Sequence, residues 1–441
     1  MEIAHPGIIK YCFLIIPIIP NHYLRNAMDT LHPTRRIRAL MPSYVQNFAC
    51  TGADCEDTCC AGWTVTIDKK TYEAYRQSPS SEFADRFKGD IKRLGEPAPD
   101  AEYARIELVA ATGECPMLEE RLCAVHKAWG EDKLSDTCFG YPRKLMQAGG
   151  VMQQTLTLSC PEAARLALLA DNAFEFSEAE ISVRPSTVDQ LLPKFGLTVE
   201  QMNEIRFFCV QIIRTEGMEL WQKIAMLGVF CESLTQALNA GQPDQIAQLF
   251  HSTGELIASG EAQAMCDGIT AHSDIQALTF NLLWRFAKTI QMRPSHLKVF
   301  NAVDVGMGAD PMTGQVSEQE LIARYQQGLA LLPSAFSKAP AFMDNFVLNE
   351  MLRETFPFGL DSASPKEHYL RLITRFGLVR FMLAVQCQPE QTPPNLATLA
   401  NTVQVFARRF QHDIEFAKKV DSCFENAGWH QLDKIFRLLK P

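Results

Sequence analysis

The chain has 441 residues, of which 47% are hydrophobic and 21% are charged, and its formal net charge is −9. This composition is typical of a soluble globular protein that is long enough for two or three domains. The acidic balance argues against general nucleic-acid binding, which needs clustered Lys and Arg to contact phosphates.

Residues 1–40 contain apolar patches, prolines and a basic stretch at residues 35–38. The apolar run 8–20 is too short to span a bilayer, and it lacks the basic start and cleavage site of an export signal. We therefore expect a cytoplasmic protein whose thiols are reduced or metal-bound. Three alternatives stay open for residues 1–40. They could touch a membrane surface, be disordered, or be a non-native extension before a true start at Met41.

Residues 41–168 are rich in cysteine and are expected to form a small, irregular α+β region. Apolar residues favour short strands at Trp63–Ile67 and Ala101–Val109. A helix is expected over Lys69–Gln77, because Asp68 can cap its first turn.

Residues 169–441 are expected to form an all-helical domain, so that the fold class is mainly α. Pro161, which suits a first helical position, already predicts a helix just before this region. Apolar residues recur with the helical period in the following segments: Ile205–Ile213, Leu220–Leu238, Ile275–Ile290, Leu321–Leu332, Phe342–Leu352, Tyr369–Val385, Leu399–Phe410 and Ile435–Leu439.

Eight of the fourteen cysteines lie in the cysteine-rich region, and we take all eight as candidate metal ligands. They are Cys50, Cys55, Cys59, Cys60, Cys115, Cys123, Cys138 and Cys160. Four of them follow one another within eleven residues and are poor disulfide partners for each other, because a bridge requires particular Cα separations and Cβ directions. Thiolates packed so closely can instead share a metal.

The metal itself is left open by these residues. Thiolate ligands select zinc, copper(I) or iron–sulfur clusters. Structural zinc sites usually have two spaced cysteine pairs, which this run does not resemble. Cys115 and Cys160 are each followed by a proline, as a ligating cysteine of an iron–sulfur protein often is. Eight thiols exceed one tetrahedral centre, so either two centres exist or only some of the cysteines bind.

Several motifs resemble those of the flagellin lysine-N-methylases. They are the stretch from Tyr44 to Asp68 that contains the clustered cysteines, Cys115-Pro-Met-Leu with Leu122-Cys123, Leu134-Ser-Asp-Thr-Cys-Phe-Gly-Tyr-Pro-Arg143, and Leu158-Ser-Cys-Pro-Glu-Ala-Ala-Arg165. The pattern begins near Met41. The cysteine layout also resembles a broader group of small zinc- or iron-chelating domains.

The resemblance implies a cytoplasmic enzyme that transfers methyl groups from S-adenosylmethionine to lysine side chains of flagellin before export. It also implies a cysteine-bound iron–sulfur cluster of the four-iron type, with zinc as the alternative. Flagellin would then be the protein partner, and a homo-oligomer is one option.

Lysine methylation needs a neutral amine, although the pKa of free lysine is near 10.4. The site must desolvate the ammonium or place a base beside it. Asp57, Asp136 and Tyr141 lie between the presumed ligands and are our candidate catalytic residues.

The binding site for the methyl donor is not identifiable in the sequence. No glycine-rich turn follows a strand, and the Cys-x3-Cys-x2-Cys pattern of radical enzymes is absent. A second interpretation is therefore a helical protein-binding scaffold that carries a structural zinc or cluster module without catalytic activity.

Overall fold

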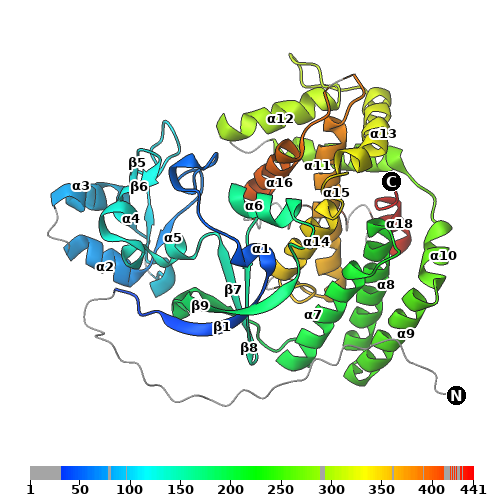
Figure 1. Ribbon diagram of the computed structural model, residues 1–441, viewed down its shortest axis with the longest axis horizontal. Coiled ribbons are helices and arrows are strands. Elements are labelled where there is room, and N and C mark those ends of the chain that lie inside the picture. The colour runs from blue at the N-terminus through cyan, green and yellow to red at the C-terminus, as the bar shows by residue number, and fades with distance from the viewer. Residues whose placement is uncertain are drawn as a thin grey trace.

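The computed structural model describes residues 31–77, 81–95, 97–288, 294–359, 362–390, 392–411, 418, 420, 422, 424, 428–429 and 431–441. It has a small lobe around helices α2 to α5, a larger helical lobe, and a sheet between them (Figure 1). The prediction of a mainly helical protein with a small strand-containing N-terminal part is confirmed.

A five-stranded sheet connects the two lobes. Its strands are β1 (Arg35–Pro42), β7 (Arg143–Ala148), β8 (Val151–Leu156), β9 (Phe176–Val183) and β10 (Val188–Gln190). Their order is β10-β7-β8-β1-β9, with β1 antiparallel to β9 and parallel to β8. The first strand is therefore an interior strand, and both of its neighbours come from residues more than a hundred positions later.

The small lobe contains short elements. Its strands are β2 (Thr66–Ile67), β3 (Ile91–Arg93), β4 (Ala104–Ile106), β5 (Leu118–Glu119) and β6 (Leu122–Cys123), and its helices are α2 (Lys69–Gln77), α3 (Ser81–Asp90), α4 (Ala124–Trp129) and α5 (Asp136–Gly140). The helix predicted over Lys69–Gln77 is confirmed, and Asp68 accepts the Thr71 backbone N–H at 2.9 Å as its cap. The two predicted strands are present but shorter than expected.

The helical lobe follows the predicted periodicity closely. Its helices are α7 (Val199–Arg214), α8 (Leu220–Asn239), α9 (Ile246–Ala258), α10 (Glu261–Asp267), α11 (Ser273–Ala287), α12 (Pro294–Gly306), α13 (Glu318–Ala335), α14 (Phe342–Arg353), α15 (Pro365–Gln386), α16 (Leu396–Phe410) and α18 (Leu432–Arg437). Helix α6 (Pro161–Leu169) begins at the expected proline and packs against α14 and α16. Two strands, β9 and β10, lie within residues that we expected to be helical.

The apolar cores divide the chain differently from the predicted boundary at residue 168. One small core contains Val65, Phe83, Met117 and other residues between positions 65 and 134. Hairpin β7–β8 and helix α6 belong instead to the large core of the helical lobe. The reason is that β8 pairs with β1, while α6 buries its apolar face on the helices.

The predicted boundary at residue 40 is also not a boundary of the fold. Strand β1 spans it, and Ala39 and Met41 are buried in the large core. On the exposed face, Arg36 and Arg38 pair with Glu180 and Glu178 of β9, each at 3.1 Å. The expectations about a membrane contact or an extension therefore concern residues 1–30 at most, which lie outside the described residues. Among the described helices, none is long and apolar enough to span a bilayer.

Candidate functional site

The loop that carries the clustered cysteines lies at the junction of the lobes. Helix α1 (Ser43–Gln46) precedes it, and a 3₁₀ turn at Gly52–Asp54 brings the chain round to Cys55. Arg121 in the β5–β6 turn donates hydrogen bonds to the carbonyl oxygens of Ala53 and Cys55. The small lobe thus holds one side of the loop through main-chain contacts.

The helical lobe holds the other side of the loop through Asp57, one of the predicted catalytic residues. Its side chain is only 5% exposed. Gln404 on α16 donates a 2.9 Å hydrogen bond to its Oδ2 atom, and His296 on α12 lies 3.5 Å from the same oxygen. The same Gln404 amide donates to the Ser159 carbonyl oxygen at 2.9 Å, so it also ties the loop to the start of α6.

Arg408, one turn further along α16, holds the next part of the loop. It donates hydrogen bonds to the carbonyl oxygens of Thr58 at 3.0 Å and Ala61 at 2.7 Å. It also donates to the hydroxyl of Tyr141 at 3.1 Å, and that buried hydroxyl lies 3.2 Å from the Ser159 hydroxyl. Burial raises the pKa of Tyr141 well above its ordinary value, so this side chain is a neutral hydrogen-bonding group.

Thiols from distant segments converge beside this loop. The Cys60 thiol is hydrogen-bonded to both Cys59 and Cys123, although Cys123 lies on strand β6. These bonds lower the pKa of Cys59 to about 7 and that of Cys123 to about 6, while the pKa of Cys60 itself rises. The Cys115 backbone N–H donates to the Cys60 carbonyl oxygen at 2.7 Å. Cys138 also interacts electrostatically with Cys59, Cys115 and Cys123. Five of the eight predicted ligands therefore lie close together, namely Cys59, Cys60, Cys115, Cys123 and Cys138.

The other three thiols lie on the side of the loop that faces α6. Cys160, at the start of that helix, interacts electrostatically with Cys50, Cys55 and Cys59. Burial raises the pKa of Cys160 to about 12. The structure thus brings all eight predicted ligands into one region, and Cys59 interacts electrostatically with thiols of both sets.

The donor set fits a thiolate-bound metal group, and its spacing helps to distinguish the alternatives. Among the described residues, no three thiol sulfurs lie within 4.8 Å of one another. A four-thiolate zinc site with Zn–S bonds near 2.3 Å would place its sulfurs about 3.8 Å apart. A four-iron cluster needs wider spacing, because each thiolate binds a different iron. The described thiols therefore do not stand at the spacing of a tetrahedral zinc site.

A cleft of about 1150 Å³ opens beside the loop on the side of the small lobe. Its lining is formed by Cys55–Thr58, Gly62–Thr64, Arg105–Glu114, Leu118 and Arg121. Glu107 and Glu114 carry carboxylates with no cationic partner among the described residues, whereas Arg121 is occupied by the loop carbonyls. Arg105 also lines the cleft, so the cleft presents carboxylates and guanidinium groups together next to a thiol cluster.

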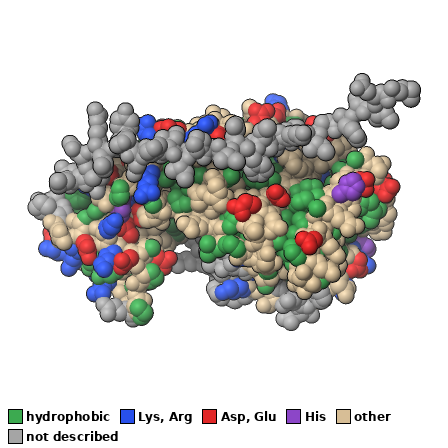
Figure 2. Space-filling view, turned by 90° about the horizontal axis from the view of Figure 1, so that it is seen from below, with side chains coloured by type: hydrophobic (Ala, Val, Ile, Leu, Met, Phe, Trp, Pro, Cys, Tyr) green, Lys and Arg blue, Asp and Glu red, His purple; other side chains and the backbone are tan. Residues whose placement is uncertain are grey.

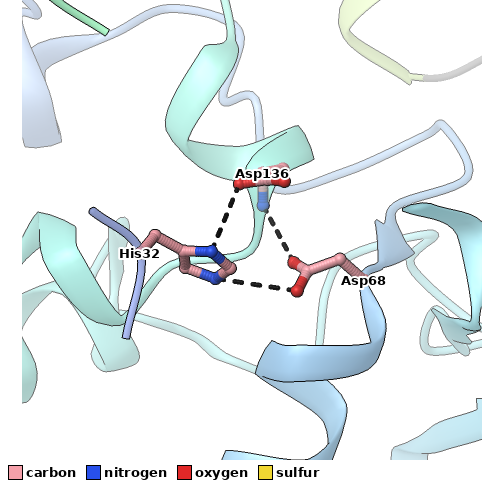
Figure 3. Close-up of side chains that lie close together, drawn as sticks. All are labelled: His32, Asp68 and Asp136. Carbon is pink, nitrogen blue, oxygen red and sulfur yellow. Dashed lines mark hydrogen bonds and ion pairs between the residues drawn. The ribbon is translucent and has the colours of Figure 1, made fainter. Parts of the chain in front are cut away.

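Asp136, the second predicted catalytic residue, lies outside the lining of this cleft. Its carboxylate faces the Nδ1 atom of His32 at 3.7 Å, and the Nε2 atom of His32 lies 3.6 Å from Asp68 (Figure 3). Arg184, whose side chain is 1% exposed, donates to Asp136 at 3.2 Å, and Thr71 donates to both oxygens of Asp68. The three groups are satisfied by protein partners, so we interpret them as a clamp that fixes residues 31–34 to the small lobe.

The structure thus places the three predicted catalytic residues in different surroundings. Asp57 borders the cleft, Tyr141 is half-buried behind the loop, and Asp136 belongs to the clamp. Sequence reasoning missed His296, Gln404 and Arg408. No local pattern distinguishes them, because each lies on an ordinary amphipathic helix hundreds of residues from the cysteines.

The surface carries no extended field of positive charge on the face seen in Figure 2. There, Lys and Arg gather over the small lobe, where they are mixed with Asp and Glu. This agrees with the net charge of −9.

Comparison with known proteins gives consistent matches. The family described as the FliB lysine N-methylase C-terminal domain matches residues 206–438. The lysine-N-methylase of Salmonella typhimurium (strain LT2) is 22% identical over 389 residues, which cover 87% of this chain and 94% of that protein. The flagellar biosynthetic protein FliU of Salmonella muenchen is 33% identical over 153 residues, or 34% of this chain and 89% of FliU. No solved structure matches.

Fold and site together define a two-lobed, mainly helical protein in which a thiol cluster borders a cleft. The family match covers more than half of the chain and includes all three helical residues that hold the cysteine loop. The chain belongs to the FliB lysine N-methylase family, and the predicted enzyme class, a protein-lysine N-methyltransferase, is confirmed.

Proposed function

We propose that this protein transfers methyl groups from S-adenosylmethionine to lysine side chains of flagellin, in the cleft beside the cysteine loop. One observation carries the proposal. Asp57, between two candidate ligands, is fixed by the helical lobe while it lines a cleft in the small lobe. Both lobes therefore meet where a thiol cluster and a substrate-sized space adjoin. The flagellar name of the relative FliU supports flagellin as the substrate.

The chemistry of the cleft suits a lysine side chain. Glu107 and Glu114 would attract the ammonium group, and charge complementarity of this kind gives specificity and speeds association. Between them, Val109, Ala110 and Ala111 provide apolar surface for the methylene chain. Contact with apolar surface also desolvates the amine, which favours its neutral form.

In the transfer, the lysine nitrogen first loses a proton, and its lone pair then forms the bond to the methyl carbon. The electrons of the broken C–S bond stay on sulfur, which leaves as a thioether. Glu107 is the proposed proton acceptor. Asp57 is the proposed positioning residue, since its carboxylate is already engaged by Gln404 and His296. Tyr141 and Asp136 would likewise act through the elements that they hold.

Cysteine thiolates would hold an iron–sulfur cluster of the four-iron type at the junction. Such a cluster would supply a redox-active iron centre next to the cleft. The wide spacing of the thiols supports a cluster over zinc. Methylation would take place in the cytoplasm, before flagellin is exported.

The test is methyl transfer to purified flagellin from S-adenosylmethionine with a deuterated methyl group. We expect deuterated methyl groups on flagellin lysines, found by mass spectrometry after digestion. A metal-loaded protein that leaves flagellin unlabelled would overturn the proposal. The matched control is flagellin whose lysines have been chemically blocked.

A further inference from the structure

Five of the eight thiols pack in two different cores. Cys115 is buried in the small core, and Cys60, Cys123 and Cys138 pack against it. Cys160 is instead buried in the large core. A single centre built from all of these cysteines would have to join the cores, whereas two centres can each serve one of them.

Main-chain contacts hold the first group together. The Cys115 N–H donates to the Cys60 carbonyl oxygen at 2.7 Å, and the Leu118 N–H donates to the Cys115 carbonyl oxygen at 2.9 Å. Leu118 is in turn paired with Cys123 across the β5–β6 hairpin. Cys138 follows Asp136 on α5, where Ser135 caps the helix.

Side-chain contacts hold the second group together across the lobes. Gln404 donates 2.9 Å hydrogen bonds both to Asp57 and to the carbonyl oxygen of Ser159, which precedes Cys160. Arg165 on α6 forms a 2.5 Å ion pair with Glu56, next to Cys55. Segments 55–59 and 159–165 therefore lie against each other.

The two groups also differ in their access to solvent. In the second group, Cys50 and Cys59 are exposed, Cys55 is partly covered and lines the cleft, and Cys160 is buried. In the first group, Cys115 is buried and the other three are partly covered. A half-exposed group beside a cleft suits reaction, and a covered group inside a small core suits structural support.

The small lobe has a physical need for such support. Its strands are two or three residues long, and its core lies within a segment of about seventy residues. Cores of this size rarely stabilise themselves without disulfides or a metal. Four thiolates drawn from four separate segments would cross-link β6, α5 and the two loops that carry Cys60 and Cys115.

We propose that Cys60, Cys115, Cys123 and Cys138 bind a second, structural metal centre, distinct from a cleft-side centre bound by Cys50, Cys55, Cys59 and Cys160. Its ligand class is an iron–sulfur cluster held by four thiolates. The proposal rests on the proposed function only in assigning the reaction to the cleft-side group. The division into two centres can be tested without any activity.

The test counts iron, zinc and sulfide per chain in protein purified without oxygen. The samples are the unchanged protein, Cys160→Ser, Cys138→Ser and the control Cys266→Ser, whose thiol is buried on α10 of the helical lobe. We expect Cys160→Ser to lose one centre and keep the other, Cys138→Ser to show the converse, and Cys266→Ser to keep both.

Cys138→Ser could fail to fold, and the Cys160→Ser sample keeps the proposal testable in that case. Loss of all metal in Cys160→Ser, or no loss in either variant, would overturn the proposal. A second measurement follows metal release from the unchanged protein by a chelator. Two phases are expected, because two of the cleft-side thiols are exposed whereas none of the other four is, and a single phase would contradict the proposal. If the protein holds two centres but leaves flagellin unlabelled, the proposed methylation of flagellin is disproved and the division into two centres still stands.

Discussion

The Nη2 atom of Arg408 donates a 2.7 Å hydrogen bond to the carbonyl oxygen of Ala61, just after the adjacent cysteines 59 and 60. The two residues are separated by more than three hundred positions in the chain. This contact, with its companion to Thr58, makes the conformation of the cysteine loop depend on helix α16. The helical lobe is thus part of the thiol site.

Replacing Arg408 with Gln is expected to destabilise the protein by about 2–4 kcal/mol, because buried carbonyl oxygens lose a charged donor. The free energy of unfolding in urea measures this effect. Arg285→Gln, at an exposed position of α11, is the matched control and should stay within about 0.5 kcal/mol of the unchanged protein. Equal effects at the two positions would contradict the role of Arg408.

The stability of the helical lobe should fall between pH 6.5 and 4 because of His368. Burial lowers the pKa of this histidine to about 4, and its Nδ1 atom accepts the Gly359 backbone N–H at 3.0 Å. The unfolded chain binds a proton near pH 6.5 and the folded chain only near pH 4, so unfolding takes up protons between these values. Stability is therefore complete above pH 6.5 and is lost as the pH falls, by on the order of 3 kcal/mol.

The measurement is the free energy of unfolding as a function of pH. His368→Asn keeps a hydrogen-bond acceptor but cannot titrate, so its slope in this range should be smaller. Glu354, Arg371 and Arg375 interact with the ring and stay in place in the variant. Identical slopes for the two proteins would show that His368 is not responsible.

A chain that begins at Met41 should fold poorly. It lacks Arg35–Leu40, most of an interior strand that pairs along its whole length with β9. It also lacks His32, which contacts Asp68 and Asp136 in the small lobe. We expect a lower melting temperature and aggregation in size-exclusion chromatography, compared with a chain that begins at Leu31. An unchanged melting temperature would show that β1 is dispensable.

The free carboxylates of the cleft should control substrate affinity. Exchanging both Glu107 and Glu114 for Gln is expected to raise KM for flagellin by about tenfold, because two exposed charge pairs contribute up to about 1 kcal/mol each, and to lower kcat, because the proposed proton acceptor is removed. Glu216→Gln, in the exposed turn between α7 and α8, is the control and should leave KM unchanged. If the double variant binds flagellin as well as the unchanged protein, the lysine enters elsewhere.

The sequence predicted those elements whose signals are local. Asp68 with the following nine residues contains both the cap and the helix that it begins, and α8 shows its period over twenty residues. Strand β1 was missed because its arginines were interpreted as a basic stretch. Their partners, Glu178 and Glu180, lie about 140 residues away in the chain. The alternation of exposed Arg36 and Arg38 with buried Ala39 therefore could not be interpreted as a strand without knowing that β9 pairs with it.

The residues of the candidate site also divide into those with a local signal in the sequence and those without one. All eight cysteines could be selected because cysteine itself is the signal, and the structure gathers them in one region. His296 and Gln404 could not be selected, because a histidine or glutamine on an amphipathic helix is usually an ordinary surface or core residue. Their role depends on the packing of α12 and α16 against the loop, which is a property of the tertiary structure alone.

The central claim is that a cysteine-bound cluster beside the cleft is needed for methylation of flagellin lysines. The most direct test measures the methyl transfer rate and the iron and sulfide content on the same oxygen-free samples, prepared with graded cluster occupancy. The account predicts a rate that rises in proportion to iron and sulfide, and no transfer by Cys55→Ser or Cys59→Ser. Full methyl transfer by iron-free protein would contradict it.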